Sequence, residues 1–89
     1  MSNEMAKLNS EWKIQDNCLV REFSFKGFNK VMSFTNAVAW IANQMNHHPE
    51  MLINFKTCSV RSTTHDECNS VTDKDYELAI AIDKLLKSH

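Results

Sequence analysis

Apolar residues recur at helical spacing in the middle of the chain. Between residues 28 and 46 they follow one another at intervals of three and four residues: Val31, Phe34, Val38, Ile41 and Met45. This spacing places them on one face of an α-helix. Pro49 cannot continue a helix, and the residue before a proline avoids the α region. We therefore expect the helix to end near Asn46 or His47.

A second helical pattern occupies residues 71–87. Its expected buried face consists of Leu78, Ile82, Leu85 and Leu86. Thr72 is the expected N-cap, and Asp75 stands three residues later, where an acid completes a capping box. Val71 and Tyr76 occupy the positions that form a hydrophobic staple around such a cap.

Alternating apolar and polar residues predict four strands arranged as two hairpins. The first hairpin covers residues 12–17 and 18–26 and turns at Asp16-Asn17. The second covers residues 51–55 and 59–65 and turns near Lys56-Thr57. The element order is therefore β-β-α-β-β-α. It predicts an α+β, two-layer fold, in which a four-stranded antiparallel sheet carries both helices on one face.

Length and composition narrow the class of protein. The chain has 89 residues, of which 43% are hydrophobic and 24% charged, so we expect one globular domain over residues 1–89. The net charge of −1 disfavours direct binding to nucleic acid. No apolar run approaches the ~20 residues of a membrane helix, and the N-terminus lacks the pattern of a signal peptide. An odd number of cysteines, three, fits a reducing cytoplasm better than a disulfide framework.

Histidines are the main candidates for chemistry. His47 and His48 follow the first helix, and His65 ends the fourth strand. Imidazoles titrate near neutral pH and could exchange protons with a ligand if the second hairpin returns beside the helix. Alternatively, adjacent histidines are simply polar residues near the negative end of a helix. A metal site with Cys68 as fourth ligand is a third hypothesis, although the spacing matches no common zinc pattern.

Other chemistries have weaker support. Cys68 follows two acids, Asp66 and Glu67, which disfavour a reactive thiolate. Gly27 is the only glycine, which excludes the glycine-rich loops that bind phosphates and dinucleotides. Among the aromatic residues, Phe55 lies on the strand best placed to stack near the histidines.

Several of these residues together resemble a known family. The run His47-His48-Pro49-Glu50, the aromatic Phe55, the run Thr63-Thr64-His65, and Asp75 in the first turn of the second helix are similar to the pterin-4a-carbinolamine dehydratases. Vertebrate members are also called the dimerisation cofactor of a hepatocyte nuclear factor. The resemblance spans roughly residues 12–87 and implies the same β-β-α-β-β-α fold. It implies dehydration of 4a-hydroxytetrahydropterin to quinonoid dihydropterin without a metal or cofactor, which recycles pterin for aromatic amino-acid hydroxylases.

The resemblance also implies particular site residues and partners. The implied catalytic residues are His47, His48 and His65, and the implied substrate-binding residues are Asn46, Thr63, Thr64, Phe55 and Asp75. The implied partners are a pterin substrate, further copies of the chain in a homodimer or homotetramer, and a regulator or a hydroxylase. The alternative function is a non-catalytic dimerisation or transcriptional coactivator module. Asn43 and Asn46 stand where many members have an acid and favour that alternative, whereas the intact histidine trio favours the enzyme.

Overall fold

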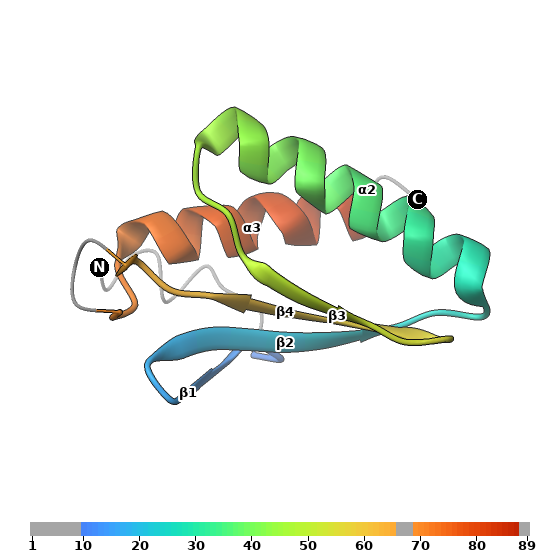
Figure 1. The fold of residues 1–89 in the computed structure, drawn as a ribbon, viewed down its shortest axis with the longest axis horizontal. Helices are drawn as coiled ribbons and strands as arrows, with labels where there is room; N and C mark the ends of the chain where they lie inside the picture. Colours follow the sequence, from blue (N-terminus) through green and yellow to red (C-terminus); the bar gives the residue numbers. More distant parts are fainter. Residues whose placement is uncertain (1–9, 66–68, 88–89) are drawn as a thin grey trace.

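Four antiparallel strands form one sheet, and two helices lie against one of its faces (Figure 1). The computed structural model describes residues 10–65 and 69–87. The elements in chain order are β1 (Lys13–Gln15), β2 (Cys18–Ser24), α2 (Phe28–Met45), β3 (Glu50–Ile53), β4 (Thr57–Ser62) and α3 (Asp73–Lys87). The predicted α+β class, two-layer arrangement and element order are confirmed.

The order of strands across the sheet is β1-β2-β4-β3. The two hairpins are joined through the long central pair of β2 and β4, whose register places Leu19 opposite Ser62 and Ser24 opposite Thr57. β1 and β3 are the edges. Because β4 is central and runs alongside both β2 and β3, the residues at its end are fixed by neighbours on either side.

The first hairpin turns as the sequence predicts. Asp16 and Asn17 both have positive φ angles, 51° and 64°. Two successive residues of this kind form a type I′ turn, whose twist matches that of the flanking strands. Asparagine and aspartate tolerate the left-handed region better than other non-glycine residues.

The second hairpin starts and ends earlier than predicted. Thr57 belongs to β4, and the turn is closed by Asn54, whose backbone N–H donates to the Thr57 carbonyl at 2.8 Å. β4 ends at Ser62 rather than His65 because the next residues bond elsewhere. Thr63 donates its hydroxyl to the Asn17 carbonyl at 2.9 Å, and Thr64 forms an isolated bridge with Ser70.

The core lies between the sheet and the helices. Its most deeply buried apolar side chains come from four elements: Leu19, Val31, Val38, Cys58, Val60, Leu78 and Ile82. The centres of the Phe23 and Phe34 rings lie 4.6 Å apart and link β2 to α2. Met45 and Leu86, predicted on the buried stripes, are each 36% exposed because they lie in the last turn of their helices. Within the described residues, neither helix has an apolar stretch long enough to cross a membrane.

The predicted cap of α3 is present. The Lys74 N–H donates to the Thr72 hydroxyl at 3.3 Å, and the Thr72 N–H donates to the Asp75 carboxylate at 2.8 Å. The bond from the Thr72 N–H to Asp75 is the return bond of a capping box, whereas the Thr72 hydroxyl caps the second helical residue instead of the third. The staple residue Tyr76 is buried, and Val71 packs against the same core.

Asn46 ends α2 with a left-handed residue, at a φ of 54°. The His47 N–H then donates to the Ala42 carbonyl at 3.0 Å, and the Asn46 N–H donates to the Asn43 carbonyl at 3.3 Å. This pair of bonds defines a Schellman motif. The turn reverses the chain immediately before His47, so the geometry of the helix end decides where the adjacent histidines point.

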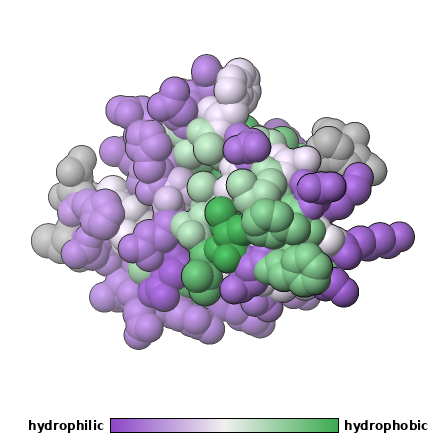
Figure 2. Space-filling view, turned by 45° about the vertical axis from the view of Figure 1, so that its right-hand side comes forward, coloured by the Kyte–Doolittle hydropathy of each residue, from purple (hydrophilic) through white to green (hydrophobic). Residues whose placement is uncertain are grey.

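Hydrophobic side chains also remain on the surface. Figure 2 shows a group of them on one face. This face is at the end of the molecule that contains the start of α2 and the β3–β4 turn (Figure 1). Exposed residues of these elements include Phe28, Leu52, Ile53 and Phe55, with Leu52 at 64% and Phe55 at 69% exposure. Leu52 and Ile53 are on an edge strand, which has unpaired backbone groups as well.

Substitution of Asn46 tests the left-handed turn. A β-branched residue clashes in this conformation, so we expect Asn46→Val to lower the free energy of unfolding by about 1–2 kcal/mol. Asn46→Gly should stay close to the wild type because glycine adopts the conformation freely. Urea unfolding followed by circular dichroism measures both. Gln44→Val, at an exposed position inside α2, controls for helix propensity, and an equal loss in that variant would contradict the role of the turn.

Candidate active site

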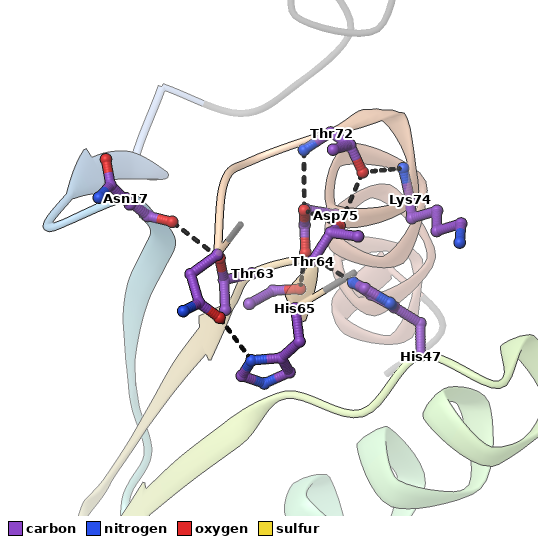
Figure 3. A network of polar contacts seen from close by, with 10 residues as sticks. Asn17, His47, Thr63, Thr64, His65, Thr72, Lys74 and Asp75 are labelled. Carbon is purple, nitrogen blue, oxygen red and sulfur yellow. Dashed lines mark hydrogen bonds and ion pairs between the residues drawn. The ribbon is translucent and has the colours of Figure 1, made fainter. Parts of the chain in front are cut away.

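Three elements meet around one hollow: the end of α2, the end of β4 and the start of α3 (Figure 3). The hollow has a volume of about 250 Å³ and is lined by Asn46, His47, His48, Thr63, Thr64, His65 and Lys74. The first three of these residues follow α2 in the sequence, the next three follow β4, and Lys74 lies in the first turn of α3. Segments far apart in the sequence thus bring all three candidate histidines to one place.

The Asp75 carboxylate is the buried centre of this region, with no exposed surface. Oδ1 accepts from His47 Nε2 at 2.6 Å and from the Ser62 hydroxyl at 2.5 Å. Oδ2 accepts from the Thr64 hydroxyl at 2.7 Å and from the Thr72 N–H at 2.8 Å. A carboxylate has about four acceptor positions, and all of them are used. The group therefore joins α2, β4 and α3 through bonds to a charged acceptor, which are stronger than neutral ones.

Thr64 and Thr72 form a chain of hydrogen bonds next to Asp75, and the direction of each bond is defined. Thr64 must donate to the carboxylate, so its oxygen accepts from the Thr72 hydroxyl, 2.7 Å away. The Thr72 oxygen in turn accepts from the Lys74 N–H. Each hydroxyl has its direction fixed by the next, which makes the wall of the hollow rigid.

Asp75 is held in its ionised form. Burial raises the pKa of its carboxyl, but the hydrogen bonds from His47, Ser62, the Thr72 N–H and Thr64 lower it by more. The pKa therefore lies below the ordinary value of 3.8. A negative charge without exposed surface stands directly behind the hollow at neutral pH.

This charge orients His47. An ionised carboxylate can only accept, so Nε2 of His47 has the hydrogen and Nδ1 is the ring atom left for a ligand. The His47 side chain is 13% exposed, which leaves one edge of the ring accessible. A carboxylate that fixes the tautomer and orientation of a histidine is the arrangement used to prepare an imidazole for proton transfer.

The other two histidines have different surroundings. His65 Nδ1 lies 2.6 Å from the side-chain oxygen of Asn69, so Nδ1 donates and Nε2 is the free ring nitrogen. In Figure 3 its ring is turned away from Asp75. His48 is exposed and has no hydrogen bond to another described residue. The hollow thus contains one imidazole fixed by a charge, one fixed by an amide and one that can adapt to a ligand.

The predicted site residues divide into three groups. Six of them line the hollow: Asn46, His47, His48, Thr63, Thr64 and His65. Asp75, predicted to contact the substrate, lies behind His47 with every acceptor position occupied, so its position suits it to orienting His47. Phe55 is at the β3–β4 turn, at the opposite end of the sheet, and does not line the hollow.

Sequence reasoning missed Lys74. It is the cationic side chain among the residues lining the hollow, and it could have been found from its position between the cap residue Thr72 and the buried Asp75. Asn43, where an acid was expected, does not line the hollow, so a carboxylate lost there affects the site indirectly at most.

Metal ligation finds no support in the geometry. Within residues 10–65 and 69–87, no three histidine, cysteine, aspartate or glutamate side chains are grouped so that they could hold a metal ion. Cys68, the fourth candidate ligand, lies outside the described residues. Cys58 is buried in the core, and burial raises the pKa of its thiol, which disfavours a reactive thiolate.

Comparison with known proteins identifies the class. A model of the family described as pterin 4 alpha carbinolamine dehydratase matches residues 1–85. A protein of Legionella pneumophila (strain Corby), named "Putative pterin-4-alpha-carbinolamine dehydratase", is 43% identical over 88 residues, which cover 97% of this chain and 77% of that protein. A protein of Nitrosomonas eutropha (strain DSM 101675 / C91 / Nm57) with the same name is 38% identical over 86 residues, 97% of this chain and 75% of the relative. The chain belongs to the pterin-4a-carbinolamine dehydratase family, as the sequence motifs predicted.

Solved structures agree on the fold. A crystal structure described as a transcriptional coactivator/pterin dehydratase from Brucella melitensis has a TM-score of 0.83 at 29% identity, covering 94% of this chain and 89% of that one. A pterin dehydratase-like protein, described as a RuBisCO assembly factor in the alpha-carboxysome, has a TM-score of 0.73 at 16% identity, covering 86% and 90%. At that identity the second likeness concerns the fold alone.

Replacement of Asp75 by asparagine should destabilise the fold and reduce its sensitivity to acid. We expect a loss of about 1–3 kcal/mol in the free energy of unfolding for each buried donor left without an acceptor. In the wild type the carboxylate contributes fully above 3.8, its unfolded pKa, and the contribution is lost as the pH falls through the lower folded pKa. The variant lacks this contribution, so acid should cost it less stability.

Urea unfolding at about pH 7 and about pH 3 measures both effects. Glu22→Gln is the matched control, because Glu22 is an exposed carboxylate on β2. Equal acid sensitivity in wild type and Asp75→Asn would show that another group dominates.

Proposed function

We propose that this protein dehydrates 4a-hydroxytetrahydropterin to quinonoid dihydropterin, and that it does so by histidine acid–base catalysis. The observation that supports this best is the group of three imidazoles around one hollow, one of them oriented by a buried ionised carboxylate. Family membership makes a pterin the expected substrate. Quinonoid dihydropterin must be reduced to tetrahydropterin before aromatic amino-acid hydroxylases can use it again. The proposed role is therefore to recycle pterin for such enzymes.

The reaction needs two proton transfers. The bond from C4a to its hydroxyl breaks and the hydroxyl leaves as water, so a general acid must give it a proton. N5 loses its proton to a general base as the C4a–N5 double bond forms. Two imidazoles on different sides of a hollow can perform both steps, and each is worth roughly 10²–10⁴-fold in rate. The reaction involves no net oxidation, and the proposed mechanism uses no cofactor.

We assign the proton transfers to His47 and His65. Each has one ring nitrogen fixed by a hydrogen bond, to Asp75 and Asn69 respectively, and the other left for the substrate. Asp75 is a positioning residue, since its carboxylate keeps Nδ1 of His47 aimed at the hollow. Its negative charge also stabilises the imidazolium that forms when His47 accepts a proton.

The remaining lining residues would bind the heterocycle. His48 has no partner among the described residues, so it can donate to the departing hydroxyl or accept from the ring. Asn46, Thr63 and Lys74 provide donors and acceptors for the polar edge of a pterin. Phe55 is too distant from this hollow within one chain to stack on the same heterocycle.

The alternative is a non-catalytic module that pairs with itself or with a regulator. The apolar side chains exposed along β3 and the neighbouring turn favour such a role, and the Brucella melitensis protein is described under both functions. An assay separates the two: freshly generated 4a-carbinolamine is followed with and without protein. Dehydration at the spontaneous rate would favour the module over the enzyme.

Histidine variants test the mechanism. We expect His65→Ala to lower kcat by about 10²-fold or more, the size of one lost acid–base contribution. His48→Ala should raise KM as well, because a binding interaction is removed. Asn36→Ala, exposed on α2 and outside the hollow, is the control and should keep the wild-type rate. Wild-type dehydration by a His47→Ala, His65→Ala double variant would falsify the histidine mechanism.

We further propose a homodimer or homotetramer. The exposed Leu52 and Ile53 lie on an edge strand, where a second chain could cover the apolar side chains and pair the free backbone groups. Sedimentation at micromolar concentration should give a multiple of the 10.3 kDa chain mass. Substituting Leu52→Lys should shift the protein toward the monomer, and a wild type that sediments as a monomer would refute the proposal.

A further inference from the structure

A groove between the two helices lies away from the candidate active site. It has a volume of about 420 Å³ and is lined by Phe25, Lys30, Ser33, Phe34, Ala37, Leu85 and Leu86. Because α2 and α3 run in opposite directions, the first turns of α2 lie beside the last turns of α3, at the other end of α2 from His47 (Figure 1). None of the groove residues lines the hollow around the histidines.

The interior of the groove is apolar and recessed. Phe34 is 7% exposed, and the centre of its ring lies 5.0 Å from that of Phe25. Leu85 packs against the same core from α3. On α2, Ser33 and Ala37 are one turn apart on the same face of the helix, where larger side chains would fill the space. Small residues on one helix and large apolar residues around them thus leave a cavity with hydrocarbon walls.

Lys30 is the charged side chain among the described residues that line the groove. It is exposed and lies three residues before Ser33, so the ammonium and the hydroxyl belong to the same face of α2. No ion pair joins Lys30 to another described residue. Residues 23–49 and 84–87 contain no acid, so these segments offer the ammonium no counter-charge. The groove is therefore complementary to an apolar ligand with one negative group.

The size of the groove fits a small ligand. Ligand pockets usually enclose ~300–1,000 Å³, are mostly apolar, and orient the ligand with a few polar groups. The groove falls within this range at about 420 Å³, with the Lys30 ammonium and the Ser33 hydroxyl as its polar side chains.

Two other occupants fit less well. A second copy in a two-fold dimer would present the same patch on both sides, which brings the Lys30 of both chains into one interface. A bilayer surface takes up apolar side chains that protrude into it, whereas Phe34 and Leu85 lie inside the groove. A single hydrocarbon chain can enter the groove, and a carboxylate at its end supplies the charge that Lys30 lacks.

We propose that the groove between α2 and α3 binds an amphiphilic acid. Its hydrocarbon chain lies along Phe25, Phe34 and Leu85, and its carboxylate binds the Lys30 ammonium through a charge-assisted hydrogen bond. The inference does not depend on the dehydratase function, because the groove and the candidate active site share no residue.

Isothermal titration calorimetry of the whole chain with decanoate tests the site. We expect saturable binding of one decanoate per chain, at least 100-fold tighter than binding of butanoate, because butanoate has six fewer methylenes and each buried methylene contributes about 0.8 kcal/mol. Decyltrimethylammonium has a decyl chain with the opposite charge and should bind more weakly than decanoate. No saturable binding of decanoate, or equal binding of decanoate and butanoate, would overturn the proposal.

Variants of α2 locate the site. Lys30→Met should weaken decanoate binding about fivefold, the scale of one partly exposed charge pair, and should narrow the difference from decyltrimethylammonium. Lys13→Met removes an exposed lysine on β1 and should keep the wild-type affinity. Ala37→Leu should weaken binding at least tenfold by filling the groove, whereas Ala39→Leu, at an exposed position on the same helix, should not. Wild-type affinity in both Lys30→Met and Ala37→Leu would place the ligand elsewhere.

Two further measurements distinguish the other occupants. Co-sedimentation with vesicles that contain phosphatidylglycerol, without saturable decanoate binding, would overturn the proposal in favour of a membrane surface. A smaller sedimenting mass in Ala37→Leu than in Ala39→Leu, again without decanoate binding, would overturn it in favour of a second copy.

Discussion

One buried carboxylate holds the candidate site together. Asp75 closes the capping box of α3, accepts from two hydroxyls at and beyond the end of β4, and binds the first residue after the turn that ends α2. Without it these three chain ends have no common partner, and two buried hydroxyls, one imidazole and one backbone N–H lose their acceptor. A charge placed in the interior is expensive unless it is fully bonded, and here all four positions are bonded. Fold and chemistry thus depend on the same atoms.

Much of the fold could be predicted because it follows from local patterns. The spacing of Val31, Phe34 and Val38 sets the buried face of α2, and Pro49 limits how far that helix can run. The cap at Thr72 and Asp75 has a sequence signature of its own. Strand ends were less predictable, since they depend on where side chains find partners in other elements. Thr63 leaves the ladder for the Asn17 carbonyl, 46 residues away, and nothing near Thr63 in the sequence signals that bond.

The identity of the site residues was easier to predict from the sequence than the orientation of their side chains. Motif spacing located the histidines, but tautomers and orientations arise from contacts between distant segments, such as that of His47 with Asp75. Phe55 was expected near the histidines because of the strand assigned to it, yet it lies in the β3–β4 turn at the far end of the sheet. Asn46 was interpreted as a lost acid, whereas its left-handed backbone gives asparagine a structural reason to be there. Lys74 was overlooked because a lysine in a first helical turn is usually a solvated side chain.

The Schellman turn after α2 couples the positions of His47 and His48, because one turn places both residues. Asn46, His47 and His48 are consecutive residues after the helix. The bond from the His47 N–H to the Ala42 carbonyl holds this segment against the last turn of α2. Fraying of the last turn would withdraw all three side chains at once and leave His65 without its counterparts. Local opening is a normal part of native-state dynamics and is cheapest at helix ends. Amide hydrogen exchange at His47 would therefore report the fraction of molecules in which the site is assembled, with no substrate present.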